Sequence, residues 1–257
     1  MSISFSADRQ YNFGTTVKQV DFFAFPRTGS HFLQYCLSGL FDLVSRLPAA
    51  ILTNAEAASR QNELNELAIY ALKLREPGVP YQPLWVNPMP NGVHGKPIAV
   101  ENPALILIRH PLAALYSAWR ARKRLGFQLE SAADFARHLD EYQAFYDAGQ
   151  SLAQAKPQST LIARFEDLVA EVATLERLVE FIGLRPKLSP HFVHWVTRFE
   201  NMVAQGERSF YREGNNDAWK TDAEFAKLVA AAGSARDFER FGYSTQEAPP
   251  RSQASRT

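Results

Sequence analysis

The segment VDFFAFPRTGSH at residues 20–31, with residues 32–47 behind it, decides the fold of this chain. Residues 20–25 are a short, aromatic-rich run suited to a buried strand, and Pro26 ends that run. Apolar residues recur at helical spacing through 32–47, which predicts a helix. The intervening PRTGSH is therefore a tight strand-to-helix loop, the repeating unit of an α/β protein.

The same order of strand, loop and helix recurs towards the carboxyl terminus. The apolar run ALILI at 104–108 is typical of a central parallel strand, and 161–165 is predicted to be another strand. Helices are predicted over 54–75, from Pro111 to about Arg124, and over 131–155, 168–182, 190–203 and 222–231. The pattern predicts an α/β fold of three layers, in which helices flank a central parallel sheet.

Two segments depart from this alternation. Residues 77–97 contain six prolines, so we expect irregular structure there, either a binding loop or lid or a simple surface connection. Residues 247–257, EAPPRSQASRT, are expected to form a disordered tail. Since neither an internal repeat nor a long linker interrupts the chain, a single domain is expected over 1–246.

Composition excludes several classes of protein. Of 257 residues, 28 are Lys or Arg and 27 are Asp or Glu, so the net charge of +1 gives no sign of bulk nucleic-acid or membrane-surface binding. A single cysteine, Cys36, excludes an intrachain disulfide and predicts a buried thiol in a reducing compartment. With no signal-peptide pattern and no apolar run of about 20 residues, we expect a cytoplasmic protein without a membrane span.

The loop after the first predicted strand has the composition of an anion site. A glycine between strand and helix lets backbone amides converge on an anion, and the helix N-terminus adds a favourable dipole. The loop lacks the leading glycine and the Gly-Lys pair of nucleotide triphosphatases, which disfavours ATP or GTP hydrolysis. A plain connection, with Arg27 a solvated surface charge, is the alternative.

A second candidate lies in RHPLAALYS at 109–117. Arg109 follows the apolar strand 104–108 and Ser117 lies about two helical turns further on. Strand ends in open α/β sheets face the ligand crevice, where a guanidinium can hold a phosphate through two parallel hydrogen bonds. The alternative is an arginine at a helix start that pairs with a nearby carboxylate.

Four segments, in this order, resemble the motifs of sulfotransferases that use 3'-phosphoadenosine-5'-phosphosulfate (PAPS). They are FPRTGSHFL at 25–33, RHPLAALYS at 109–117, FEDL at 165–168 followed by FIGL at 181–184, and REGNNDAWK at 212–220. The resemblance spans residues 20–243 and implies the sulfotransferase fold, which is related to that of P-loop nucleotide triphosphatases. It further implies PAPS as co-substrate, 3',5'-ADP as product and no metal requirement.

The resemblance also assigns roles to residues. Arg27, Thr28, Gly29, Ser30 and His31 would surround the 5'-phosphosulfate, Phe32 and Phe165 would lie beside the adenine, and Arg109, Ser117, Arg212 and Gly214 would bind the 3'-phosphate. Because sulfuryl transfer, like phosphoryl transfer, depends on positioning and charge stabilisation, Arg27 is the expected catalytic cation. Many members carry lysine at this position, and arginine is a poor proton donor, so a general-acid role is not expected.

The sequence gives fewer signals for the residues that would act on the acceptor substrate. An acceptor hydroxyl or amine must lose a proton during transfer, and the resemblance implies a histidine base upstream of Arg109. His94, in NGVHGKP, is our hypothesis for that base, although the lysine and threonine that precede it in the family are absent. Glu101 is the fallback, and Glu213 replaces a basic residue of the family's last motif.

Two other functions fit parts of the pattern. A small-molecule kinase would explain a nucleotide site, but the missing Gly-Lys pair and the missing Mg²⁺-binding acidic pair count against it. A non-catalytic relative that binds nucleotide or a partner would explain the imperfect matches at Arg27 and His94. The sequence specifies neither the small-molecule acceptor nor the oligomeric state.

Overall fold

The computed structural model describes residues 17–43, 71–88, 100–198 and 217–233, together with 201, 238–239 and 242–243. Its strands are β1 (Lys18–Ala24), β2 (Asp42–Leu43), β3 (Pro83–Pro88), β4 (Ala104–Ile108) and β5 (Thr160–Arg164). Its helices are α1 (Ser30–Leu40), α4 (Pro111–Leu125), α5 (Ala132–Ala155), α6 (Phe165–Ala170), α7 (Val172–Ile182), α8 (Pro190–Val196) and α10 (Ala223–Ala232), with short 3₁₀ turns at Pro157–Ser159 and Ala218–Lys220.

The strands form one sheet in the order β2-β3-β1-β4-β5, and every pairing is parallel. The central strand, β1, pairs with β3 on one side and β4 on the other. From β1 the chain first builds the β3 side and then returns to build the β4 side. Such a switch point opens a crevice at the carboxyl ends of the two strands, where ligands bind in open α/β sheets.

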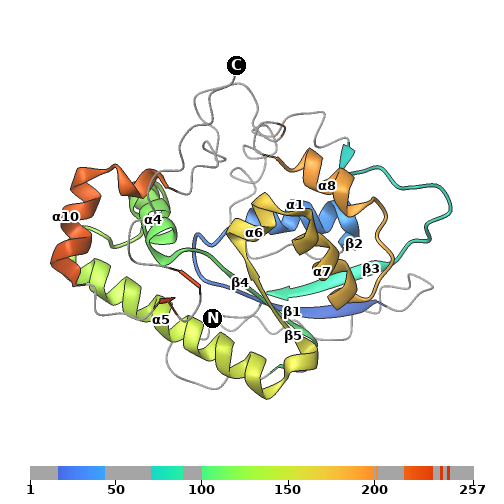
Figure 1. Cartoon of the computed structure of the whole chain (residues 1–257), viewed down its shortest axis with the longest axis horizontal. Helices are drawn as coiled ribbons and strands as arrows, with labels where there is room; N and C mark the ends of the chain where they lie inside the picture. Colours follow the sequence, from blue (N-terminus) through green and yellow to red (C-terminus); the bar gives the residue numbers. More distant parts are fainter. Residues whose placement is uncertain are drawn as a thin grey trace.

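Helices cover both faces of the sheet, which confirms the predicted three-layer α/β fold (Figure 1). Since neighbouring strand residues point to opposite faces, Phe22 packs with α1, α7 and α8, whereas Phe23 packs with α4, α5 and α10. All five residues of β4 are buried, as a central parallel strand requires. Two apolar cores therefore hold the carboxyl ends of β1 and β4 rigidly in place.

The prediction of irregular structure throughout 77–97 was wrong, because β3 lies within that segment. Prolines stand at the two ends of β3, and Leu84 and Val86 between them are fully buried in the core beside α1. A proline at a strand end costs little, since the ladder needs few of the amides there. The many prolines in this segment prevented the prediction of β3. Pairing with β1 and β2 in the folded sheet stabilises this strand.

Several helices and strands begin or end at other residues than predicted. The helix predicted over 32–47 is α1, which begins at Ser30 and ends at Leu40 before β2, and α8 ends at Val196. The strand predicted over 161–165 is β5 at Thr160–Arg164, so Phe165 begins α6 instead. The helix predicted over 168–182 is two helices, because Glu171 adopts an extended backbone between α6 and α7.

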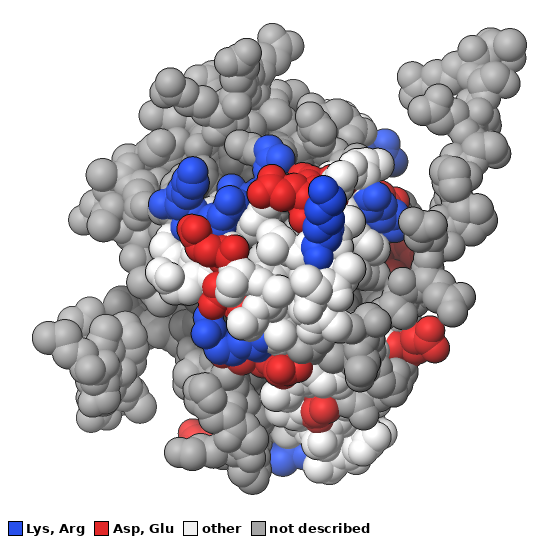
Figure 2. Space-filling model, turned by 90° about the vertical axis from the view of Figure 1, so that its left-hand side faces the viewer, with Lys and Arg blue, Asp and Glu red and all other residues white. Residues whose placement is uncertain are grey.

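Surface charge and the single cysteine agree with the composition. On the face in Figure 2, basic and acidic side chains lie interspersed. Ion pairs such as Arg137–Asp134 and Lys220–Asp217 neutralise charge locally. Cys36 is a free thiol buried on α1, and burial raises its pKa to about 12. Among the described helices, none is long and apolar enough to cross a bilayer.

Candidate functional site

The loop between β1 and α1 adopts an unusual backbone conformation. Gly29 has φ of 102°, and Arg27 has φ of 70°, the one positive value at a non-glycine residue among those described. A side chain at Gly29 would place its Cβ 2.2 Å from the Phe165 ring, so the loop backbone packs directly on that ring. A strained non-glycine residue at a strand-to-helix turn is typical of a functional loop.

Local hydrogen bonds close the loop over the start of α1. The Thr28 hydroxyl donates to the Phe25 carbonyl at 2.8 Å, and the Thr28 amide donates to the same oxygen at 3.3 Å. Thr28 is completely buried, so it holds the shape of the loop. Gly29 caps α1 without a side-chain hydrogen bond, so no capping side chain covers the amino-terminal end of this helix.

The two predicted cationic residues meet at the switch point between β1 and β4. Arg27 Nε donates to Ser117 Oγ over 3.0 Å, and Arg109 Nη1 donates to the Arg27 carbonyl over 3.1 Å. These contacts join residues that lie 82 to 90 positions apart in the chain. Two guanidinium groups and a serine hydroxyl, predicted separately from two motifs, therefore belong to one crevice.

The Arg109 guanidinium sits in an environment that favours an anion. It lies 4.6 Å from the centre of the Phe165 ring, and burial lowers its pKa from the ordinary arginine value. The lowered pKa means that the charge has lost hydration, only part of which Glu166 offsets electrostatically. A phosphate arriving at this guanidinium would restore the lost stabilisation through charge-assisted hydrogen bonds.

The backbone that carries Arg109 is held by three side chains from two other elements, α5 and α6. Tyr142 and Tyr146 of α5 both donate their hydroxyl hydrogens to the Arg109 carbonyl, the former over 3.0 Å. The next amide, of His110, donates to Glu166 Oε1 over 2.9 Å. We call these three side chains and the peptide between Arg109 and His110 the arginine clamp.

Two aromatic residues from the carboxyl-terminal part of the chain, Tyr243 and Trp219, pack against the arginine clamp. Tyr243 donates its hydroxyl hydrogen to Glu166 Oε2 over 2.9 Å, and burial raises the pKa of this phenol. The His110 ring stacks on Trp219 at 5.0 Å between centroids and meets Tyr243 edge to face at 5.4 Å. Trp219 belongs to the last predicted motif, so this contact places the end of that motif beside Arg109.

Sequence reasoning missed the arginine clamp, although signals for it exist. Tyr142 and Tyr146 lie one helical turn apart on the buried face of α5, a spacing that is visible in the sequence. Glu166 stands inside the FEDL segment and was given no role. A carboxylate directly after a predicted strand is the cue that could have revealed it.

The remaining predicted residues fall into two groups. Ser30 and His31 are half-buried in the first turn of α1. Phe32 and Phe165 are buried and meet edge to face at 5.7 Å, so their place beside an adenine stays a prediction. Predicted residues outside those described are His94, Arg212 and Gly214.

Glu101 is excluded as the fallback base by its position. Its amide donates to Asp21 Oδ2 at the amino-terminal edge of the sheet, just before β4 begins. Arg109 follows the opposite end of β4, which at five residues is about 16 Å long. No carboxylate so far from the Arg27 loop can take a proton from an acceptor held there.

His138 lies in the core beside the start of the Arg27 loop. It is 8% exposed, its ring meets Phe25 edge to face at 5.1 Å, and its Nε2 has no hydrogen-bond partner among the described residues. Burial lowers its pKa to about 4, with a smaller contribution from Arg137. His138 is therefore neutral near pH 7 and supports the residue that precedes the Arg27 loop.

The fold defines a class of protein: it is the fold of the sulfotransferases. One similar solved structure is the mouse sulfotransferase SULT7A1 complexed with PAP, at 13% identity, covering 82% of this chain and 80% of that one, with a TM-score of 0.50. Another is the sulfotransferase domain of the Synechococcus PCC 7002 olefin synthase, at 16% identity, covering 90% and 96%, also with a TM-score of 0.50. At such identities the likeness establishes the fold alone. No family model and no curated protein sequence matches the chain.

The site can thus offer two cations, a serine hydroxyl and the backbone amides of a helix start, all near the switch point between β1 and β4. Among the described residues, no group of three or more His, Cys, Asp or Glu side chains is arranged to hold a metal ion. The chemistry of these groups is that of binding and stabilising anions.

Proposed function

We propose that this protein is a sulfotransferase that moves the sulfuryl group of PAPS to a hydroxyl or amine of a small acceptor and releases 3',5'-ADP. The observation that carries the proposal is the contact between the Arg27 loop and Arg109, supported by the 3.0 Å hydrogen bond from Arg27 to Ser117. PAPS has anionic groups at both ends of one adenosine, and the crevice offers a cation for each. The sulfotransferase fold and the PAP bound to the mouse neighbour support the same donor.

Each residue acts through charge and position. The donor supplies an activated sulfuryl group. Arg27 and the first amides of α1 stabilise the negative charge that grows on the 5'-phosphate side as the group leaves. Arg27 is permanently charged, so it performs this role without titrating near neutral pH.

The other end of the donor lies at Arg109, whose backbone is held by the arginine clamp. Arg109 and Ser117 receive the 3'-phosphate, joined by Arg212 and Gly214 from the segment that precedes Trp219. Since Trp219 stacks on His110, that segment ends close to Arg109. Because the Arg109 backbone is already fixed, less conformational entropy is lost when the ligand binds.

The finer parts of the proposal concern the acceptor and the setting. His94 takes the proton from the acceptor, because Glu101 lies at the wrong edge of the sheet. One domain over 1–246 carries the activity, with 247–257 as a tail. The protein works in the cytoplasm, in keeping with its free, buried thiol.

Calorimetric titration with 3',5'-ADP and 5'-AMP tests the donor site, since the two nucleotides differ only by the 3'-phosphate. We expect 3',5'-ADP to bind at least about tenfold more tightly, because charge-assisted hydrogen bonds to that phosphate contribute about 1.5–3 kcal/mol each. Arg109→Gln should abolish the preference. Arg120→Gln, which changes a half-exposed arginine of α4 outside the crevice, is the matched control and should keep it. Equal affinity of the wild type for both nucleotides would refute the donor site.

Transfer of labelled sulfate from PAPS to a library of phenols, alcohols and amines tests the reaction. His94→Ala should lower kcat by about a hundredfold or more, as expected for loss of a general base. If 3',5'-ADP binds but no acceptor is sulfated under any condition, the protein is a nucleotide-binding relative without turnover.

A further inference from the structure

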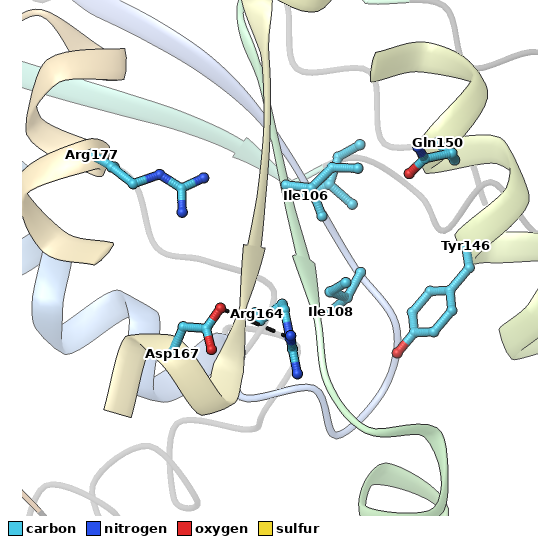
Figure 3. A pocket seen from close by; sticks show the side chains of 9 residues that line it. Ile106, Ile108, Tyr146, Gln150, Arg164, Asp167 and Arg177 are labelled. Carbon is cyan, nitrogen blue, oxygen red and sulfur yellow. Dashed lines mark ion pairs between the residues drawn. The ribbon is translucent and has the colours of Figure 1, made fainter. Parts of the chain in front are cut away.

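A separate hollow of about 270 Å³ lies at the free edge of the sheet, beside β5 (Figure 3). Its walls come from α5 on one side and from α6 and α7 on the other. The residues that line it are Ile106, Ile108, Tyr146, Gly149, Gln150, Ile162, Arg164, Asp167 and Arg177. Of these residues, Tyr146 alone also belongs to the arginine clamp.

The floor of the hollow is apolar. Ile106 and Ile108 of β4 and Ile162 of β5 present their side chains to it. Gly149 of α5 borders this floor closely, since a Cβ there would come within 3.3 Å of Ile106 Cδ1. An apolar group of limited size can therefore lie on the three isoleucines.

One wall of the hollow is charged. Arg164 and Arg177 stand on the same side of it in Figure 3, with Asp167 beside Arg164. The Arg164–Asp167 pair is loose, with 3.9 Å between Nε and Oδ2. Within the described part of the chain, no residue forms an ion pair or hydrogen bond with the exposed Arg177 guanidinium. Asp167 and the nearby Glu166 both interact electrostatically with Arg164, and Arg177 adds a second cation to this wall.

The hollow is separate from the donor crevice. Arg27 follows β1, whereas the hollow lies at β5, two strands away and so about 10 Å distant across the sheet. Tyr146 links the two sites, because it lines the hollow and also donates to the Arg109 carbonyl. A ligand in the hollow would not displace the donor.

We propose that this hollow is a second ligand site, which binds a small amphipathic monoanion. The apolar body of the ligand lies on Ile106, Ile108 and Ile162, and its carboxylate or sulfate accepts hydrogen bonds from Arg164 and Arg177. Asp167 and Glu166 offset part of the charge of the two arginines, so this wall suits a single negative charge. The volume, just below the usual range for ligand pockets, selects a body about as large as one ring. The site does not depend on the proposed sulfotransferase reaction.

The experiment uses the full-length protein with ¹³C-labelled isoleucine δ-methyl groups, titrated with benzoate, phenyl sulfate and phenol. We expect the two anions to shift the methyl signals of Ile106, Ile108 and Ile162 in a saturable way. Ile182, buried on the opposite face of the sheet, should not move and is the internal control. Phenol, which has the ring but no charge at neutral pH, should bind at least about tenfold more weakly.

Variants locate the site and separate its parts. Arg177→Gln should weaken binding of both anions about tenfold or more, whereas Arg120→Gln should not, and both should keep the affinity for 3',5'-ADP. Ile162→Phe, which fills the hollow, should abolish the methyl shifts and gives a second route if one variant folds poorly. Tighter binding of phenyl sulfate identifies sulfate esters as the natural class, and tighter binding of benzoate identifies carboxylates. Absence of shifts at the three isoleucines, equal binding of phenol, or anion binding that survives both substitutions would overturn the proposal.

Discussion

The Arg27 loop and the arginine clamp lie side by side at the switch point, yet they are held in opposite ways. Thr28 and Gly29 shape the loop through hydrogen bonds to Phe25 and Leu33, a few residues away. The peptide after Arg109 is held by Tyr142, Tyr146 and Glu166, which lie 33 to 56 positions further along the chain. One half of the site is built locally, and the other is assembled by the tertiary fold.

This difference has consequences for how each half fails. A locally built loop depends on backbone conformations that few residues can adopt, so single substitutions should damage it severely. In the arginine clamp, several side chains hold the same peptide. The loss of one of them should therefore be partly compensated by the others. Substitutions in the Arg27 loop should therefore cost more than those in the arginine clamp.

Gly29→Ala should have the largest effect. The new Cβ would meet the Phe165 ring at 2.2 Å in a backbone with φ of 102°, so we expect a loss of about 4 kcal/mol in the free energy of unfolding. Binding of 3',5'-ADP should fall at least about a hundredfold, measured by calorimetry on the folded fraction. Gly183→Ala is the matched control, because its φ is 70° but nothing lies within 4 Å of the new Cβ. Equal losses in both variants would mean that the contact with Phe165 is unimportant.

Glu166→Ala should be the most damaging single change in the arginine clamp. It leaves the His110 amide and the Tyr243 hydroxyl without their shared acceptor, which should cost about 3 kcal/mol of unfolding free energy in urea titrations. The preference for 3',5'-ADP over 5'-AMP should shrink with it. Glu166→Gln keeps one acceptor oxygen and should recover about half of the loss. A preference unchanged in Glu166→Ala would show that the clamp does not position Arg109.

The two tyrosines on the Arg109 carbonyl should compensate for each other. Tyr142→Phe and Tyr146→Phe each leave one donor on that oxygen, so each should cost only about 0.5 kcal/mol. The double variant leaves the carbonyl without either donor and should cost about 2 kcal/mol, more than the sum of the single losses. Strictly additive losses in the double-mutant cycle would contradict shared support.

His138 should make the loop side of the site sensitive to acid. Its pKa is lowered to about 4 in the folded protein, whereas an exposed histidine has about 6.5, so the unfolded chain binds the proton first. The neutral ring therefore stabilises the fold above pH 6.5, and this stabilisation is lost as the pH falls from about 6.5 to about 4. Between pH 7 and 4.5, His138→Leu should lose about 2 kcal/mol less than the wild type in urea titrations. Parallel pH profiles would rule out this role.

The sequence predicted most of the fold because buried parallel strands and amphipathic helices leave periodic patterns. The runs that became β1, β4 and β5 were recognised from their apolar residues, and α5 matched its prediction to within a residue. It failed at β3, where prolines at the strand ends obscured two buried residues. A short strand depends on its neighbours for stability, and neighbours are not visible in a local pattern.

By itself the sequence determined the α/β class, the strand-to-helix loop at Arg27 and the pairing of Arg109 with a strand end. Only the tertiary structure decided that Arg27, Ser117 and Arg109 share one crevice, that Glu101 lies at the wrong edge, and that tyrosines and Glu166 hold the Arg109 backbone. The physical reason is distance along the chain. Periodicity and turn chemistry act over a few residues, whereas these contacts join segments that only the closed sheet brings together.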